Sequence, residues 1–420
     1  MKPLLAVLGA VLVWPAACGW AEEGASAGAL TLEEGYRLAL KRSEEIAIHQ
    51  ELINETEGRF MQALGTALPR ASFSLSEKRQ DGSGGSSFTL KEVPERKFVF
   101  TQPLFAGFKE FAAMGASRAE HRQRQFEYSK AELTLMVDVS DAFYLLLEQR
   151  QDREALETVR EALRARLKEL EERARLGRSR ASELASAEAK LRRVEADIEE
   201  AKRDEATGEH LLAFLTGLPR IGALQDAPDN TLMLSPEEAY LAKVDQRPDV
   251  HATEQAWRVA EQQVTIARAK FFPTVDAEAH YYTTRVGAAS GVDWDAILTV
   301  DVPIFQGGEA LGATTEAAAK AREAKLRYEE AQRAASLDIR DAYVKAATGL
   351  LRVQMLEQAL QASEESYRLQ TEDYRMSLVS NLDVLQELEA LEGVRRARIA
   401  ASYEAKRFYW VLQAAIGERL

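Results

Sequence analysis

The chain has 420 residues, of which 29% are charged and only 8% aromatic, and its formal net charge is −13 at pH 7. This composition is typical of long exposed helices and coiled coils rather than of a thick globular core. The acidic balance argues against nucleic acid as a partner, because phosphate binding favours a basic surface.

Residues 1–21 have the features of a secretory signal peptide: a positive Lys2, an apolar core at 4–13 and a small-x-small cleavage site. We therefore expect an exported protein. The single cysteine, Cys18, lies in this segment, and its lipidation is disfavoured because Pro15 stands where a lipobox prefers an aliphatic residue. No run of about 18 apolar residues follows, so no transmembrane helix is expected and a membrane crossing would need strands.

The rest of the chain divides into two similar halves, expected at 22–218 and 235–420, with a connector at 219–234. Each half begins with a predicted capping box, at 31–34 and at 235–238, where a hydroxyl and a glutamate would satisfy the free amides of a helix start. The halves repeat at a distance of about 200 residues, which is longer than the period of solenoid repeats. We expect the connector at the waist of the molecule.

Each half then changes to strict alternation of apolar and polar residues, as in ASFSLS (71–76) and VDAEAHY (275–281). Alternation predicts a strand with one wet and one dry face. A Gly- and Ser-rich connection and a returning strand follow, which predicts β-hairpins over about 70–104 and 274–304.

The polar face of these strands is expected to point inward, toward water, and the apolar face outward, toward lipid. Asp276, Glu278 and His280 alternate on one face and could be drawn as a metal site, but such a row is more typical of a solvated wall. The inward set is Ser72, Ser74, Ser76, Asp276, Glu278, Thr299 and Asp301, and the outward set is Phe73, Leu75, Phe98, Phe100, Ala277, Leu298 and Val300.

A strand-to-helix joint follows each hairpin, in TQPLFAGF (101–108) and again around 301–308. Pro103 and Pro303 are expected to end their strands because proline cannot donate to the ladder. Gly107 and Gly307 would let the backbone turn into the next helix. We expect an interfacial aromatic girdle at these joints, formed by Phe105, Phe271, Phe272 and Phe305.

Long helices are predicted over about 107–175 and 307–375, each a rod on the order of 100 Å that needs coiled-coil partners. Return helices are predicted at about 181–216 and 381–416. The first return helix carries a heptad seam, and the second keeps it only in part, with Glu387 at one seam position. The seam of the first is Leu184, Ala187, Leu191, Val194, Ile198 and Ala201.

Four strands cannot close a barrel, and open edges in lipid would leave backbone amides without partners. Subunits must therefore share a barrel. Two copies would give eight strands, whose interior side chains fill, whereas three copies would give twelve strands around a lumen.

With these features the chain resembles the TolC family of outer-membrane efflux and secretion channel proteins. The resemblance is carried by the two Pro-x-Phe-x-Gly joints, by RPDV (247–250), by Phe272-Pro273 and by YRMSLVSNLDVLQELEAL (374–391). It implies a mainly α fold with a small β part: a homotrimer whose duplicated helical hairpins form an α-barrel beneath a shared transmembrane β-barrel of twelve strands.

The resemblance also implies a function, that of a passive exit duct in a tripartite efflux or type I secretion system. Such a duct sits in outer-membrane lipid and docks to a periplasmic adaptor and an inner-membrane pump. The alternative is a periplasmic adaptor or structural coiled-coil protein without a pore, but two full copies with strands favour the duct. No phosphate loop or nucleophile elbow occurs, so we expect no enzyme and no cofactor.

The candidate site is the pair of tips between the long and return helices. In the family this end constricts the duct and meets the adaptor. Glu183 and Asp383 hold matching positions, so a trimer would carry six carboxylates whose mutual repulsion raises their pKa values. Asp383 also fits a capping box with Ser380, and the two roles can coexist. The tip residues singled out are Arg175, Ser182, Glu183, Tyr374, Arg375 and Asp383.

In the family, a tyrosine and an arginine on the second tip bond to a Thr-Asp pair on the first. Tyr374 matches the tyrosine and Ser182-Glu183 replace the pair, but Val379 stands at the arginine position. The resemblance thus predicts a closed tip held by fewer charged links, or by other arginines such as Arg178 or Arg180.

Overall fold

The protein is described by a computed structural model that covers residues 29–81, 90–226, 233–287 and 289–420. The expected signal peptide, Cys18 and part of the connector lie outside these residues.

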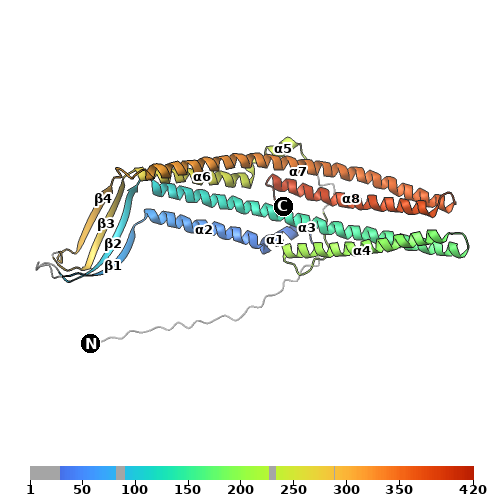
Figure 1. Cartoon of the computed structure of the whole chain (residues 1–420), viewed down its shortest axis with the longest axis horizontal. Coiled ribbons are helices and arrows are strands. Elements are labelled where there is room, and N and C mark those ends of the chain that lie inside the picture. Colours follow the sequence, from blue (N-terminus) through green and yellow to red (C-terminus); the bar gives the residue numbers. More distant parts are fainter. Residues whose placement is uncertain (1–28, 82–89, 227–232, 288) are drawn as a thin grey trace, which may run out of the picture.

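Two long helices run the length of the molecule, and the β-sheet lies at one end (Figure 1). Helix α3 (Lys109–Arg175) and helix α7 (Glu309–Arg375) have 67 residues each, on the order of 100 Å. Helices α4 (Ala181–Thr216) and α8 (Asn381–Ala415) return along the half far from the sheet. Helices α2 (Glu44–Ala67) and α6 (Pro248–Arg268) lie along the half near it. Each one-piece rod, α3 or α7, thus lies beside a two-piece rod, formed by α2 and α4 or by α6 and α8.

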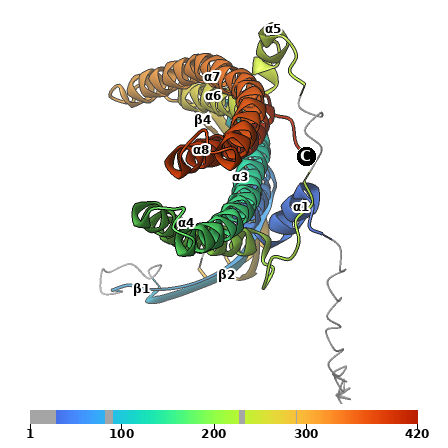
Figure 2. The same cartoon turned by 90° about the vertical axis from the view of Figure 1, so that its right-hand side faces the viewer.

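The helices form a curved wall rather than a closed bundle. Near the sheet the neighbours follow the order α2, α3, α6, α7, and toward the tips they follow the order α4, α3, α8, α7. Viewed along the long axis, this wall is an open arc (Figure 2). Helices α2 and α4 therefore lie at one edge of the wall and α7 at the other.

The first return helix packs through its predicted seam. Ala187, Leu191, Val194, Ile198 and Ala201 are buried, and Leu184 is partly buried beside them. Their partners on α3 follow the same coiled-coil spacing: Leu156, Val159, Leu163 and Leu170. At the weak seam position of the second copy, Glu387 is satisfied by the Ser366 hydroxyl, which donates to it at 3.0 Å.

The sheet is antiparallel, with strands in the order β1 (Arg70–Arg79), β2 (Glu92–Ala106), β3 (Thr274–Thr284) and β4 (Trp294–Asp301). The register places Phe73, Phe98, Tyr281 and Trp294 opposite one another in one row. Ser72, Val99, His280 and Asp295 form the adjacent row on the other face. The apolar and polar sets expected from alternation thus lie on separate faces.

One expectation about the sheet is wrong: Pro103 does not end its strand. β2 continues to Ala106, and the ladder shifts register between Pro103 and Phe105. The missing proline N–H falls at this irregularity, where no regular ladder bond is interrupted. In the second copy β4 does end before Pro303, at Asp301.

The joint between β2 and α3 requires a glycine. Gly107 has φ +63°, and a Cβ at this position would lie 2.8 Å from the carbonyl oxygen of Ala269, in the 3₁₀ turn Ala269–Phe271. Gly307 has φ +58° but open space around it. The aromatic cluster here centres on a residue that the sequence did not single out: Phe108 contacts Phe105 at 5.3 Å and Phe272 at 6.5 Å between ring centroids.

Two further members of the expected girdle, Phe271 and Phe305, are exposed and make no ring contact in the described part of the chain.

The waist lies where the two-piece rods meet. Helix α1 (Leu32–Arg42) begins at the expected capping box, in which the Glu34 N–H donates to the Thr31 hydroxyl at 3.2 Å. The second box, at Ser235, is wrong. Helix α5 (Glu237–Leu241) has Pro236 at its N-cap and no side-chain cap among the described residues, and the Ser235 N–H donates to the Tyr240 hydroxyl rather than to Glu238.

After the 3₁₀ turn Val244–Gln246, the waist is tied together by Arg247, which is only 3% exposed. Its guanidinium donates to Asp249 at 2.6 Å, to Asp338 at 3.2 Å and to the carbonyl oxygen of Ala415 at 3.0 Å. One side chain thus joins the start of α6 to α7 and to the end of α8.

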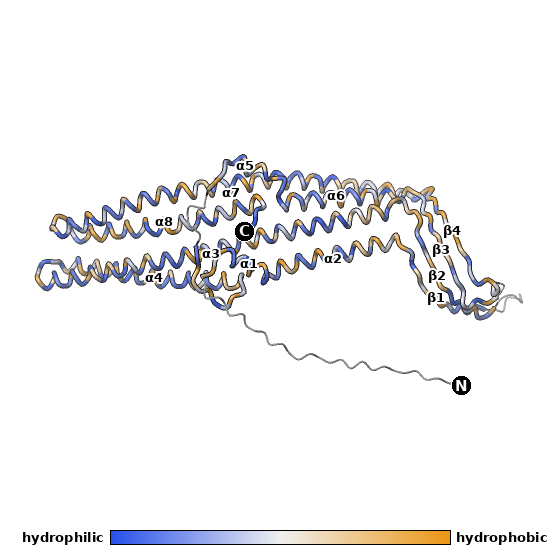
Figure 3. Tube along the Cα trace, turned by 180° about the vertical axis from the view of Figure 1, so that it is seen from behind, coloured by the Kyte–Doolittle hydropathy of each residue, from blue (hydrophilic) through white to orange (hydrophobic). Residues whose placement is uncertain are grey.

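None of the helices in the described ranges combines the length and the apolar run needed to cross a membrane. Hydrophilic and hydrophobic residues are interspersed along the helices (Figure 3).

Candidate functional site

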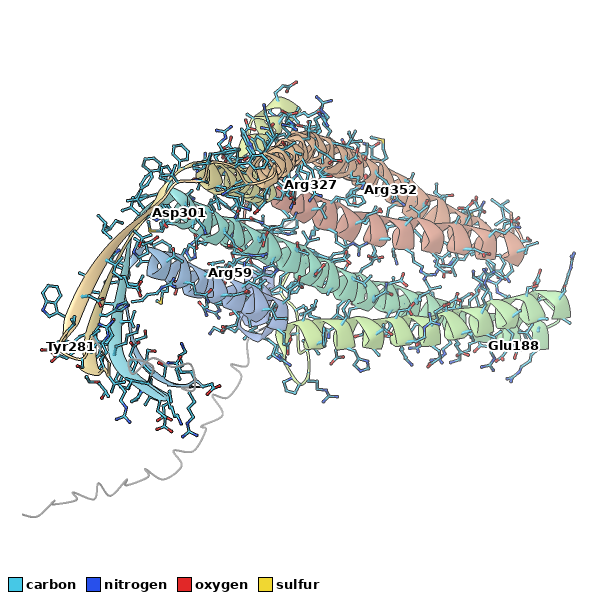
Figure 4. The ribbon with its side chains drawn as sticks, turned by 60° about the vertical axis from the view of Figure 1, so that its left-hand side comes forward. Arg59, Glu188, Tyr281, Asp301, Arg327 and Arg352 are labelled. Atoms are coloured by element: carbon cyan, nitrogen blue, oxygen red, sulfur yellow. The ribbon has the colours of Figure 1, made fainter. Side chains whose placement is uncertain are left out.

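The tips lie at the end of the molecule opposite the sheet. Figure 4 shows this separation, with Tyr281 in the sheet and Glu188 on α4 near the tip. The long helices α3 and α7 end in the same way. The Arg178 N–H donates to the Arg173 carbonyl, and the Leu378 N–H donates to the Asp373 carbonyl. This six-to-one bond requires a left-handed residue between. The left-handed residue is Gly177 in the first tip, with φ +68°, and Ser377 in the second, with φ +64°.

A carboxylate caps the start of each return helix. Asp383 Oδ2 accepts from the Ser380 N–H and from the Ser380 hydroxyl, both at 2.7 Å. Glu183 Oε2 accepts from the Ser179 hydroxyl at 2.6 Å and from the Arg180 N–H at 3.4 Å. The capping role expected for Asp383 is confirmed, and Glu183 has a similar role.

Within one chain the pKa of Asp383 is lowered, and the rise expected from six carboxylates in a trimer stays a prediction. The hydrogen bonds from the Ser380 side chain and backbone stabilise its charged form and hold its pKa below the ordinary 3.8. The expectation of a raised pKa assumed repulsion between carboxylates, whereas the nearest groups are donors.

Arg166 of α3 joins the first hairpin to the second. Its Nε donates to Asn381 Oδ1 at 2.8 Å, and its guanidinium carbon lies 3.7 Å from the ring centroid of Tyr374. Arg173 lies 4.6 Å from the same ring centroid. Tyr374 is 6% exposed and Asn381 is fully buried. We call Arg166, Arg173, Tyr374 and Asn381 the tip latch.

Two further contacts connect the hairpins beside the tip latch. Lys190 of α4 lies 3.2 Å from Glu389 and 3.5 Å from Glu392, both on α8. Leu385 and Leu388 of α8 are buried in the same apolar cluster as the seam of α3 and α4. The second hairpin is therefore held to the first by both apolar and charged contacts.

The structure does not bring the predicted gate residues together. Tyr374 makes no hydrogen bond to Ser182 or Glu183 in the described chain, because its ring packs between the arginines of the tip latch. Whether Arg178 or Arg180 replaces the missing family arginine in a closed trimer stays a prediction. Neither they nor Arg175 and Arg375 belong to the ion pairs that join described residues.

The sequence reasoning missed Arg166 and Asn381. Arg166 lies in the middle of a charged helix and, like many of its arginines, also pairs with a carboxylate of its own helix, Glu169 at 2.9 Å. A usable signal was its heptad position. Arg166 follows Leu163 and precedes Leu170, both fully buried, at spacings of three and four.

The polar row of the sheet holds a second cluster. His280 lies between two carboxylates, with Nε2 at 2.8 Å from Glu278 and Nδ1 at 2.8 Å from Asp295. The two carboxylates sit at opposite edges of the imidazole ring, so the three side chains share no common position for an ion. Within the described ranges, no group of three such residues could hold a metal.

Comparison with known proteins identifies relatives along most of the chain. Alkaline protease secretion protein AprF of Pseudomonas aeruginosa is 24% identical over 401 residues, which are 90% of this chain and 82% of that protein. Nodulation protein T of Rhizobium leguminosarum bv. trifolii is 25% identical over 176 residues, 41% of this chain. That second match spans only 38% of the nodulation protein's own length.

A solved structure shares the fold. CusC, whose crystal structures concern conformational changes during folding and transmembrane channel formation, superposes with a TM-score of 0.83 at 16% identity. The alignment covers 92% of each chain. The mainly helical fold with a small four-stranded sheet is thereby confirmed.

Residues 35–218 and 242–418 match the model of the outer membrane efflux protein family. Because these segments make up most of the sequence, the chain belongs to the outer membrane efflux protein family, which confirms the predicted transport function and outer-membrane location.

Proposed function

We propose that three copies of this protein form a passive duct through the outer membrane, with the sheets pooled into one twelve-stranded barrel and the helical walls into one tunnel. The observation that carries the proposal is the open arc, which leaves both the sheet and the helical wall with two unpartnered edges. In this role the chain conducts and performs no chemistry.

The sheet edges are matched for closure by identical copies. Because four antiparallel strands alternate in direction, β1 and β4 run opposite ways, so β4 of one copy can pair with β1 of the next in the same antiparallel sense. Such closure removes the unpaired amides that lipid cannot satisfy. The apolar row faces outward in this arrangement, with Phe73, Tyr281 and Trp294 more than half exposed in the single chain.

The edges of the helical wall carry apolar stripes. On α7, Leu337, Val344 and Leu351 are spaced by seven residues and are each more than half exposed. On the other edge, Ile48 of α2 and Phe214 of α4 are 59% and 76% exposed. A seven-residue stripe on an exposed helix needs a helical partner, which the next copy would supply.

We assign the tips to the periplasmic entrance and to docking of an adaptor and an inner-membrane pump. Exposed apolar side chains gather in these turns, which is unusual for a free helical end. Leu176, Met376, Leu378 and Leu382 are between 55% and 70% exposed. The tip latch, behind these turns, would hold the entrance in its narrow state.

The decisive experiment combines mass and conductance. Protein purified in detergent should be trimeric by light scattering and should give discrete ionic currents in planar bilayers. A monomeric sample without current would refute the proposal. A trimer without current would favour the alternative, a structural coiled-coil protein without a pore.

A further inference from the structure

A cavity of about 480 Å³ lies between α2 and α3, on the sheet side of the waist, and none of the contacts described above uses it. It is lined by Thr56, Glu57, Phe60, Met61, Ser117, Arg118, His121 and Arg122. Two guanidinium groups, two hydroxyls, one imidazole and one carboxylate thus surround a partly apolar floor.

Several of the polar groups that line this cavity lack a partner. The Ser117 residue is 6% exposed, and its hydroxyl has no hydrogen-bond partner among the described residues. Arg118 makes no ion pair in the described ranges and only stacks on Phe60, at 5.5 Å from the ring centroid. Arg122 uses its Nε to donate to Gln255 at 2.9 Å, and its terminal nitrogens have no hydrogen-bond partner among the residues that the structure describes. A buried hydroxyl without a partner is costly, so an acceptor is expected beside it.

His121, in contrast, is already satisfied. The Thr56 hydroxyl donates to the Ile53 carbonyl at 2.6 Å, so it accepts from His121 Nδ1 at 2.8 Å. His121 Nε2 then accepts from the Gln125 amide at 3.1 Å. Both imidazole nitrogens thus have partners within the protein, and the two arginines supply positive charge to the cavity.

The cavity opens on the outer side of the wall. Arg118 and Glu132 are fourteen residues apart, two heptads, and therefore share one face of α3. Glu132 contacts α1 and the C-terminal segment: the Tyr36 hydroxyl of α1 donates to its carbonyl, and Arg419 pairs with its carboxylate. Helix α1 and the C-terminus lie on the convex side of the arc (Figure 2). A ligand in the cavity would thus come from outside the tunnel.

Apolar side chains run from the cavity toward the sheet. On α2 and at its C-cap, Met61, Leu64 and Leu68 continue from Glu57 at spacings of four, three and four, and are 69%, 37% and 49% exposed. On α3, Phe111 is 70% exposed and lies seven residues before Arg118. Arg118 is about 13 Å below the start of α3, within reach of the headgroup layer of a membrane that the sheet crosses.

We propose that this cavity binds the headgroup of a phospholipid from the leaflet facing the periplasm. The phosphate would accept from Arg118, Arg122 and the Ser117 hydroxyl, while an acyl chain would lie along Phe60, Met61 and Phe111. The inference rests on the proposed membrane placement of the sheet.

Glu57 indicates which phospholipid headgroup the cavity should prefer. It lines the cavity opposite the arginines and makes no ion pair with the described residues. A carboxylate beside two guanidinium groups matches a headgroup that carries both signs. A primary ammonium can donate to Glu57, so the site should prefer phosphatidylethanolamine over the anionic phosphatidylglycerol and over phosphatidylcholine, which has no N–H.

The test is native mass spectrometry of the full trimer released from detergent after titration with each of the three lipids. Wild type should retain phosphatidylethanolamine at one molecule per subunit. Arg118→Gln combined with Arg122→Gln should weaken retention at least tenfold, since two charge-assisted bonds are lost. Glu57→Gln should abolish the preference over phosphatidylglycerol. Arg192→Gln, an equally conservative loss of an arginine near the tip, should change nothing.

A second variant separates binding from folding. Ser117→Ala removes the unpaired hydroxyl, so the lipid-free protein should melt no lower than wild type while its lipid retention falls. If the arginine variants retain lipid like wild type, or if excess inorganic phosphate displaces the lipid completely, the lipid site is refuted. If the lipid site is refuted but the protein is still a trimer with normal conductance, the proposed duct function is unaffected.

Discussion

Replacing Arg166 by glutamine should weaken the joint between the two hairpins of each subunit. The wild-type guanidinium donates to the buried Asn381 at 2.8 Å and stacks at 3.7 Å on the buried ring of Tyr374. A charged hydrogen bond contributes about 1.5–3 kcal/mol and a partly desolvated cation–π contact about 0.5–2 kcal/mol. Glutamine can recover part of the hydrogen bond, so we expect a loss of about 2 kcal/mol per subunit.

A change of that size is large for a gate. About 2 kcal/mol corresponds to a shift of roughly thirtyfold in the equilibrium between joined and separated hairpins. If the joined arrangement is the narrow state, Arg166→Gln should raise mean single-channel conductance or open probability in planar bilayers. Arg166→Lys should have an intermediate effect, because it keeps the charge and loses the planar stack.

Arg164→Gln is the matched control, because Arg164 lies on the same helix but pairs with Glu161 and Glu195 of its own hairpin. Its currents should equal those of wild type. Arg166→Gln and Arg164→Gln channels with the same conductance and open probability would contradict a gating role for the tip latch. Thermal unfolding of both variants would show whether any difference reflects general destabilisation.

Three further changes test the local geometry. Ser377→Gly should stabilise the protein by about 1 kcal/mol in denaturant unfolding, because it removes a side chain from a left-handed position. Gly107→Ala should destabilise it by several kcal/mol, since the new Cβ would overlap the Ala269 carbonyl oxygen, 2.8 Å away. Asp383→Asn should lower the melting temperature at pH 7 and by less at pH 3. The pKa of Asp383 is depressed by Ser380, so its stabilisation is present above the ordinary 3.8 and lost as pH falls through the lower folded value.

Each of these changes has a control that gives it meaning. Gly307→Ala meets open space, so it should show only the smaller cost of a left-handed alanine. Equal losses at Gly107 and Gly307 would contradict the steric argument. An unchanged or lower stability for Ser377→Gly would show that the serine side chain has a compensating contact. A difference between Asp383→Asn and wild type that persists in full at pH 3 would refute the capping account.

The sequence alone determined the features that depend on neighbours along the chain. The heptad spacing from Leu184 to Ala201 specified a seam, and alternation at 71–76 specified which side chains share a sheet face, because helix and strand periods are local properties. The duplication and the capping box at Thr31 were readable for the same reason. Together with the quoted joints, these features were sufficient to identify the family.

Only the tertiary structure decided which distant side chains meet. Tyr374 packs on Arg166, which is 208 residues earlier, rather than on the predicted pair at 182–183. The cavity at Ser117 forms because residues 56–61 of α2 lie beside residues 117–122 of α3. These contacts depend on how rods about 100 Å long are aligned beside one another. That alignment is set by the summed packing of many side chains, which no single motif encodes.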